Sequence, residues 1–231
     1  PLMMGLHVLA GDIMLAANFL QSHVLHFYHL AGLDYVDVTC AADYTGRDPD
    51  LSAVKSFLDR GVLAPFIPRS EGDYRLTGEQ NTAAVKAYVE ALNVRRNCHE
   101  LLALFGGKMP HQCTVGVGGV TTQVTMDKIL AGVSYAREIE EFVQTRYRST
   151  VLDLARAYPD YFQIGSSCGR FLSYGVFSEQ GLFQEGVFDS VKDRVETLNP
   201  AKITEEVRAS FYEDRTGGLH PGKGDTRPQP D

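Results

Sequence analysis

Four residues within positions 21–30 have side chains suited to chemistry: Ser22, His23, His26 and His29. Imidazole binds metal ions directly, and it also supports metal ligands through hydrogen bonds. His23 and His26 are three residues apart, so a helix would place both on one face. Because no Glu-x-x-His motif accompanies this H-x-x-H spacing, two interpretations stay open. Either the rings join helices through backbone carbonyls or buried water, or they border a metal or redox centre.

A long helix must position these residues, since apolar or small residues recur at alternating spacings of four and three from the start of the chain. Such spacing indicates one face of a helix. The members of this stripe are Leu6, Ala10, Ile13, Ala17, Leu20, Val24, Phe27 and Ala31, and a second stripe follows Leu15, Phe19, Ser22, His26, His29 and Leu33. Apolar residues on most of the circumference predict a buried helix. Its polar side chains then need partners, because burying them unpaired is costly.

Composition excludes several classes of protein. The 231 residues carry a net charge of −7 with scattered Lys and Arg, which argues against a nucleic-acid partner. The four cysteines, Cys40, Cys98, Cys113 and Cys168, are far apart and form no C-x-x-C pair, so no zinc or iron–sulfur signature is present. We expect reduced and mostly buried thiols.

No targeting or membrane segment is evident. The chain shows no signal peptide and no uninterrupted apolar run of about 18 residues, so no bilayer-spanning segment is expected. It opens inside a helical pattern without Met at position 1 and stops in a loop-like tail. The sequence therefore reads as a segment of something longer.

Further helices follow from capping signals. Asp48-Pro49 starts a short helix that ends at Gly61, and Thr77-Gly78-Glu79-Gln80 is a capping box for a helix ending at Gly106-Gly107. Thr125 caps a helix that is expected to run without interruption to Tyr158, before Pro159, over roughly 50 Å. The glycine-rich residues 115–120 match neither nucleotide-loop pattern, so no nucleotide site is expected there.

The C-terminal part has a different pattern of residue types. Residues 170–177 and 182–188 alternate aromatic and small residues around a turn, which predicts a hairpin, and Asn199-Pro200 is expected to open another helix. Residues 63–72 and 219–228 should be irregular. The fold class is therefore mainly α with a small β excursion: a long antiparallel helix bundle, one element short of a closed core. We expect a single domain over 1–231, with the bundle in 1–160 and a mixed β and loop part in 161–231.

Several stretches resemble the large subunit of nickel–iron hydrogenases. The His-x-x-His-Phe-Tyr-His-Leu helix of residues 23–30 runs into Leu33-Asp34-Tyr35-Val36-Asp37, as it does in that family. Residues 105–111 are similar to the family's Gly-Gly-Lys-x-Pro-His loop, and residues 118–121 to the Gly-Gly-Val-Thr that follows. His220-Pro221, Gly224, Thr226 and Pro228 resemble its His-Pro-x-x-Gly-x-Thr-x-Pro segment. The matches keep the family's order and cover nearly the whole chain.

This resemblance implies the reversible cleavage of dihydrogen into protons and electrons. It implies a nickel–iron centre held by two Cys-x-x-Cys pairs, one upstream of the first helix and one near the C-terminus of the full subunit. No such pair occurs in these 231 residues, and nickel in that site requires soft thiolates. We therefore assign neither a metal ligand nor a catalytic residue to this chain. It is expected to be a central fragment that supplies scaffold and support for the centre.

The resemblance places three residues near cofactors. Ser22 and His26 are expected beside the metal centre without ligating it. Many relatives have aspartate at the position of Ser22, and a hydroxyl cannot supply that buried negative charge. His111 is expected near the iron–sulfur cluster of a small partner subunit, the alternative being a ring bonded within its own loop.

Two other classes of function stay open at this point. The first is a non-catalytic or hydrogen-sensing homologue that keeps the bundle. The second is a stand-alone helical protein that binds a metal through His23 and His26. The resemblance also implies a periplasmic location, or membrane association through the partner subunit, with a cytoplasmic location as the alternative.

Overall fold

The computed structural model describes residues 2–62, 71–177 and 182–225, and it divides into two compact units, Pro1–Phe162 and Gln163–Asp231. The expected change from bundle to mixed structure at residue 160 lies two residues from this division. That both units belong to one domain stays a prediction. The two units are described separately below.

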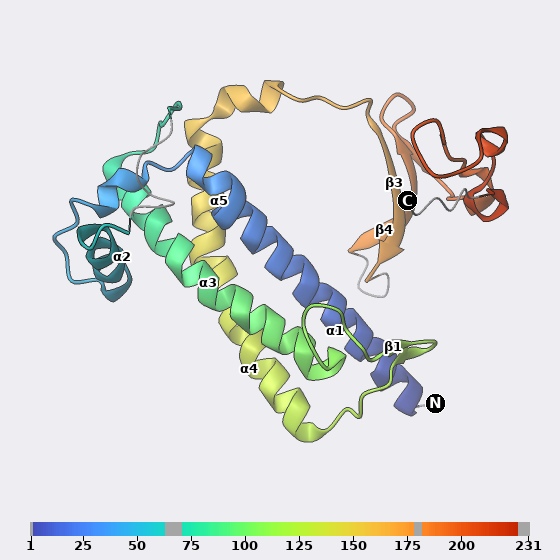
Figure 1. Ribbon diagram of the computed structural model, residues 1–231, viewed down its shortest axis with the longest axis horizontal. Coiled ribbons are helices and arrows are strands. Elements are labelled where there is room, and N and C mark those ends of the chain that lie inside the picture. Colours follow the sequence, from blue (N-terminus) through green and yellow to red (C-terminus); the bar gives the residue numbers. More distant parts are fainter. Residues whose placement is uncertain (1, 63–70, 178–181, 226–231) are drawn as a thin grey trace. The chain divides into compact units, whose positions relative to one another are not determined.

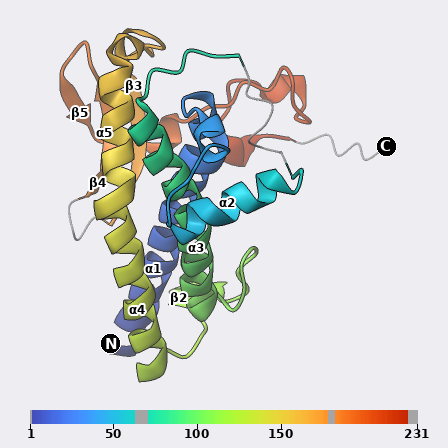
Figure 2. The ribbon, with the colours of Figure 1, turned by 90° about the vertical axis from the view of Figure 1, so that its left-hand side faces the viewer.

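The first unit is built on long helices that run side by side (Figures 1 and 2). α1 spans Leu2–Val24 and continues as a π-helical segment, Leu25–Ala31; α3 spans Gly78–Gly106. α4 spans Met126–Phe142 and continues through a second π-helical segment, Val143–Tyr147, into α5, Arg148–Ala157. α3 contacts both α1 and α4 and runs antiparallel to each, as the sequence predicts.

Local chemistry sets the ends of these helices as expected. Thr77 Oγ1 accepts a hydrogen bond from Gln80 N, and Thr77 N donates to Gln80 Oε1, which completes the capping box. α2 spans Pro49–Asp59, and Gly61 follows it with a φ of 83°. At this end of the helix Val62 N donates to Phe57 O. These are bonds that helix termini need because their last backbone groups lack partners within the helix.

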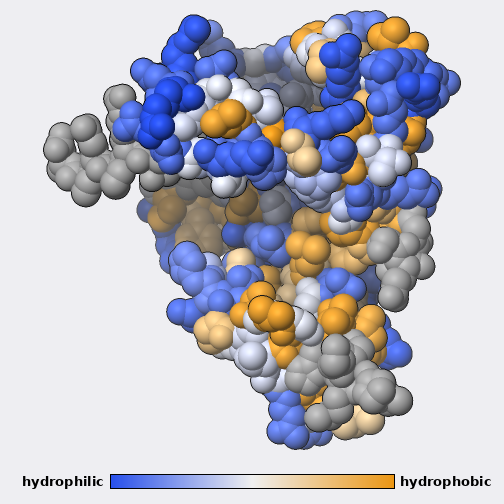
Figure 3. Space-filling model, turned by 90° about the vertical axis from the view of Figure 1, so that its right-hand side faces the viewer, coloured by the Kyte–Doolittle hydropathy of each residue, from blue (hydrophilic) through white to orange (hydrophobic). Residues whose placement is uncertain are grey.

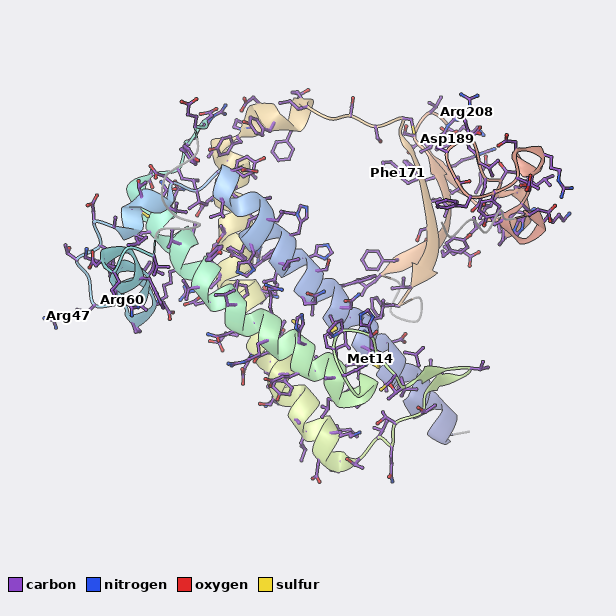
Figure 4. All side chains as sticks on the ribbon, in the orientation of Figure 1. Met14, Arg47, Arg60, Phe171, Asp189 and Arg208 are labelled. Carbon is purple, nitrogen blue, oxygen red and sulfur yellow. The ribbon has the colours of Figure 1, made fainter. Side chains whose placement is uncertain are left out.

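Two groups of buried side chains form the core of this unit. The larger group joins α1, α3 and α4 through residues that include Met14, Ala91, Leu102 and Ile139. The smaller group joins α2, α3 and the short 3-10 helix Val38–Ala41. Figure 4 shows Met14 directed from α1 toward the loop that follows α3. The small residues Ala10, Ala17 and Ala91 lie in the same core and are 2% exposed or less.

α1 is less buried than its sequence predicts. Val8, Ile13, Leu20 and Leu30 are exposed large apolar residues, with Leu30 at 64%. Figure 3 shows hydrophobic residues, in orange, at the surface of the face that it draws. All-round burial is therefore wrong for the described chain: α1 buries the face that packs on α3 and leaves another face open.

One helical stretch also corrects the expectation on membrane segments. Among the described residues, Val8–Asp34 is long and apolar enough to cross a membrane, with a mean hydropathy of 1.3. The test uses length and composition alone, and a core helix of a soluble protein passes it too. Ala10, Ala17 and Val24 of this stretch are buried in the core described above, whereas only 22% of its apolar window is buried.

A two-stranded ladder follows α3. β1, Val115–Gly116, pairs with β2, Gly119–Val120, in the glycine-rich segment, for which the sequence predicts no strand. Val120 is buried in the large core group, so this ladder anchors the chain between α3 and α4.

The second unit contains an antiparallel sheet in the order β3-β4-β5, with bounds Arg170–Val176, Phe183–Asp189 and Arg194–Glu196. β3 and β4 confirm the two strands of the expected hairpin. The turn of this hairpin lies outside the described residues. The third strand, β5, was not expected. Gly186 is required where β4 meets β5: its φ is 154°, and a Cβ there would lie 2.4 Å from Val195 Cγ1. Asn199 caps only a three-residue 3-10 helix, Pro200–Lys202, so the expectation of a longer helix is wrong.

Asp48 joins the start of α2 to α3. Its Oδ1 accepts from Asp50 N at 3.0 Å and from Leu51 N at 3.3 Å, and its Oδ2 pairs with Lys86 Nζ. The hydrogen bond from Lys86 lowers the pKa of Asp48 below its usual value. Because the folded-state pKa is the lower one, this stabilisation is present above the unfolded pKa of about 3.9 and is lost as the pH falls through the folded-state pKa.

We therefore expect Asp48→Ala to destabilise the fold by about 1–2 kcal/mol at pH 7, since both the cap and the ion pair are lost. Asp48→Asn keeps a capping oxygen and should cost less, while removing this contribution to the acid dependence of stability. Urea denaturation between pH 7 and pH 3 measures both effects. Asp59→Asn, which breaks an exposed pair with Lys55 in the same helix, is the control, and an equal loss there would contradict the assignment.

Candidate functional site

The histidine-rich segment has the wider turns of a π-helix. Leu25–Ala31 carries His26 and His29. The aromatic side chains of this segment, Phe27 and Tyr28, pack against the second π-helical segment. Phe27 and Tyr147 have ring centroids 5.0 Å apart, and Tyr28 Oη donates to Thr150 Oγ1 at 3.1 Å. Burial raises the pKa of Tyr28 to about 12, so the phenol stays a donor. π-helical turns are rare and are frequent at functional sites.

His29 connects this segment to α3. Its Nε2–H donates to the carbonyl oxygen of Tyr88 at 3.1 Å, and the two rings meet edge to face with centroids 4.6 Å apart. Burial, and secondarily the charge of Arg95, lowers the pKa of His29, which favours the neutral ring. Nδ1 is buried and has no hydrogen-bond partner among the described residues. His29 thus joins two helices, as the first interpretation proposed, and leaves one ring nitrogen unused.

The other histidines of this segment are exposed. His23 Nδ1–H donates to Phe19 O, 2.8 Å away in its own helix, so that ring is tied to the backbone. Ser22 and His26 are also exposed. The buried positions are Val24 and Tyr28, and a helix turns about 200° in two residues, so positions 22 and 26 face the opposite side. The prediction of a buried helix is therefore wrong at His26, and the placement of this residue beside a metal centre stays a prediction.

α3 carries three polar residues on the side where it contacts His29 and Gln21. Tyr88, Arg95 and His99 are spaced by seven and four residues and so share one face of the helix. His99 Nε2 lies 3.3 Å from the side-chain oxygen of Gln21, and burial, with the charge of Arg95, lowers its pKa. Arg95 Nε is buried and has no partner among the described residues. We call His29, Tyr88, Arg95, His99 and Gln21 the polar cluster.

The sequence alone does not reveal this polar cluster. In the sequence Arg95-Arg96 is only a pair of adjacent basic residues, and nothing in it separates the half-buried Arg95 from Arg96, whose side chain is 64% exposed and lies 3.7 Å from Glu100. The available signal was spacing: His99 follows Arg95 by four residues on a helix that carries apolar residues on its other faces.

The thiols of this chain do not fit a nickel centre. Burial raises the pKa of Cys98 to about 12 and also raises that of Cys40, which opposes the thiolate form that binds metals. Cys113 and Cys168 are exposed. No group of three or more His, Cys, Asp or Glu is placed to hold a metal ion in the part of the chain that the structure describes. The donor set that nickel requires is not assembled by these side chains.

The loop after α3 presents His111 to solvent. Gly107 ends the helix with a φ of 80°, Cys113 N donates to Gly106 O at 3.0 Å, and Thr114 Oγ1 donates to Phe105 O at 2.7 Å. His111 has a φ of 63°, an uncommon value for a residue with a side chain. Its ring makes no hydrogen bond with the described residues, so the alternative of a ring bonded within its own loop is not observed.

Comparison with known proteins shows which family this chain is similar to. The model of the nickel-dependent hydrogenase family matches residues 8–231. The periplasmic NiFeSe hydrogenase large subunit of Desulfomicrobium baculatum is 35% identical over 95% of this chain and 41% of its own length. The quinone-reactive Ni/Fe-hydrogenase large chain of Wolinella succinogenes is 30% identical over 95% of this chain and 44% of its own.

Solved structures agree with the sequence matches. The Ni-Fe-Se hydrogenase from Desulfovibrio vulgaris Hildenborough superimposes with a TM-score of 0.75 at 35% identity, covering 95% of this chain and 42% of that chain. The reduced, active form of the Desulfomicrobium baculatum enzyme gives 0.75 at 33% identity, covering 99% and 46%. This chain thus spans less than half the length of these relatives, and it belongs to the nickel-dependent hydrogenase family as a large-subunit sequence.

Proposed function

We propose that this chain is the central part of the catalytic large subunit of a nickel-dependent hydrogenase, which cleaves dihydrogen reversibly into two protons and two electrons. The observation that carries the proposal is the family match over residues 8–231, together with a TM-score of 0.75 to a hydrogenase at 35% identity. Family membership argues against a stand-alone metal protein that uses His23 and His26, as does the bond that ties His23 to its own helix.

Within that subunit, the chain acts as scaffold. The thiolate ligands come from parts of the polypeptide outside these 231 residues, because no Cys-x-x-Cys pair occurs here and Cys98 is a buried, protonated thiol. Ser22 and His26 lie on the open face of α1 and border the metal centre without binding it. Their exposure supports this placement, since a face that adjoins another segment is open when that segment is missing.

The partner is a small subunit that carries iron–sulfur clusters, and it faces the loop Lys108–Cys113. The loop is exposed, follows directly on a buried helix and presents an unbonded imidazole. Binding groups concentrate on such loops because a rigid scaffold positions them. The location is periplasmic or membrane-associated through the partner; named relatives are a periplasmic and a quinone-reactive hydrogenase.

Activity is tested on the full-length subunit that contains this chain, purified with its partner. We expect about one nickel per large subunit by mass spectrometry of the metal and hydrogen-dependent reduction of a viologen dye. A folded complex that contains no nickel and reduces no dye would refute the catalytic proposal. It would favour the non-catalytic homologue instead.

His111→Ala in that complex is expected to shift the reduction potential of the nearest cluster, or to slow electron transfer, while nickel content stays the same. Hydrogen bonds near cluster sulfurs tune their potentials. Redox titration followed by electron paramagnetic resonance measures the shift. Gln112→Ala, an exposed neighbour in the same loop, is the control. Loss of nickel, or unchanged spectra and rates, would show that His111 lies elsewhere.

A further inference from the structure

We propose that Tyr28 and Thr150 are positioning residues, which hold the histidine-bearing segment Leu25–Ala31 in one orientation through two consecutive hydrogen bonds to the second π-helical segment. The inference rests on the proposed function in one respect, since that function places His26 of this segment beside the metal centre. The bonds themselves do not depend on hydrogen cleavage.

The two bonds start at a buried phenol and end at a backbone carbonyl. Tyr28 Oη donates to Thr150 Oγ1 at 3.1 Å, and Thr150 Oγ1 donates to the carbonyl oxygen of Arg146 at 3.0 Å. A carbonyl oxygen only accepts, so the single hydroxyl proton of Thr150 goes to Arg146 and the threonine oxygen accepts from the phenol. Tyr28 is 3% exposed and Thr150 is 9% exposed. Such burial strengthens a hydrogen bond and makes its loss more costly.

The second bond ends in a part of the backbone that departs from the α-helix. Arg146 belongs to the π-helical segment Val143–Tyr147, and Arg148 N donates to the carbonyl of the first residue of that segment, five positions back. Two hydroxyl groups supplement this backbone bonding, because Ser149 Oγ donates to Arg146 O at 2.8 Å beside the bond from Thr150. Thr150 therefore serves the π-helical turn of its own helix and the phenol of the other helix at once.

Aromatic packing brings the two π-helical segments together without fixing their orientation. The ring centroid of Tyr147 lies 5.0 Å from that of Phe27 and 6.0 Å from that of Tyr28. The centroid of Phe142 lies 5.7 Å from that of Tyr28. Apolar contact is non-directional, whereas a hydrogen bond weakens steeply when its angle changes. The two bonds, rather than the rings, therefore determine the direction in which the two histidines leave the helix.

His29 reports on this orientation because it directly follows Tyr28 in the same π-helical segment. Its Nε2–H donates to Tyr88 O at 3.1 Å, so any shift of the segment strains or breaks that bond. Burial lowers the pKa of His29 below its usual value. A segment that loosens would expose the ring to water, and the pKa would rise toward about 6.5.

Hydrogen–deuterium exchange on the full-length subunit in its complex tests the proposal. Thr150→Val keeps the shape of the side chain, breaks both bonds and leaves the phenol of Tyr28 without a partner. The amides of residues 25–31 should then exchange at least about tenfold faster. Tyr28→Phe breaks only the first bond and should accelerate exchange about fivefold. The double variant should exchange no faster than Thr150→Val alone, because the two bonds belong to one network.

Two further variants separate positioning from general loss of packing. Thr150→Ser keeps the hydroxyl and should restore exchange to about the wild-type rate. Tyr147→Phe is the matched control, because its ring lies in the same aromatic group and its hydroxyl makes no hydrogen bond with the described residues. The pKa of His29, measured by C2-proton exchange and mass spectrometry, is the second reading. It should rise in Thr150→Val and Tyr28→Phe and stay unchanged in the other two variants.

Three outcomes would overturn the proposal: residues 25–31 exchange at the wild-type rate in Thr150→Val, Thr150→Ser behaves like Thr150→Val, or Tyr147→Phe has the effect of Tyr28→Phe. If Thr150→Val fails to fold, the comparison of Tyr28→Phe with Tyr147→Phe decides. None of these readings uses activity or nickel content. A complex with the expected exchange but without nickel would refute the proposed function and leave this inference standing.

Discussion

The 231-residue chain, produced without the rest of a large subunit, is expected to bind no nickel stoichiometrically and to oxidise no dihydrogen. Nickel in this family's site needs soft thiolates held close together. The four cysteines here form no Cys-x-x-Cys pair, and burial raises the pKa of the Cys98 thiol to about 12. The exposed histidines do not replace them, because His23 bonds its own helix and no third ligand accompanies it in the described structure.

The measurement is metal content after dialysis against a chelator, with hydrogen-dependent dye reduction measured in parallel. A variant with His23 and His26 both replaced by Asn serves as the control for weak, adventitious binding. Both proteins should lose their metal equally. One nickel per chain that survives the chelator, and that the double variant lacks, would contradict the placement of the ligands outside this chain.

Helix ends were predictable because their causes are local. Asp48 and Thr77 cap the nitrogen atoms two and three residues ahead of them, and Gly107 adopts the positive φ that ends α3. Such signals lie within four residues of the helix end that they determine. Asn199-Pro200 carries the same start signal, yet only three residues follow as a 3-10 helix. A cap starts a helix, but its length depends on an apolar face to bury.

The π-helical segments were not predictable from local pattern. The segment Leu25–Ala31 packs its aromatic rings against Phe142 and Tyr147, and Tyr28 donates to Thr150, 122 residues away. A π-helical turn forms where packing against residues far away in the sequence compensates for the poorer backbone geometry of that turn. The spacing of apolar residues contains no information about this distant packing partner. It therefore predicted an ordinary α-helix through both π-helical segments.

The buried face of the first helix was predicted only in part, for a similar reason. The spacing of Ser22 and His26 correctly placed them on one face of the helix. That face was predicted to be buried because it follows an apolar stripe, but the stripe is partly exposed in the structure. Val24 and Tyr28 determine which face is inside. Arg95 was missed because nothing in the sequence indicates that its Nε is buried. Charged residues become informative only when the helix opposite them is known.

Leu102→Ala is expected to destabilise the chain by about 3–4 kcal/mol, the largest effect among the single substitutions proposed here. Leu102 is 0% exposed and lies in the core group where α1, α3 and α4 meet. Removing its side chain loses the transfer free energy of three carbon groups and leaves a cavity that large neighbours such as Phe105 and Ile139 fill only partly. Leu130→Ala, at a position 62% exposed on α4, removes the same atoms from water-facing surface and should cost less than about 1 kcal/mol. Urea denaturation followed by circular dichroism gives both free energies of unfolding. Equal losses at the two positions would mean that α3 is not the central helix of the bundle, since its burial between α1 and α4 is what separates Leu102 from Leu130.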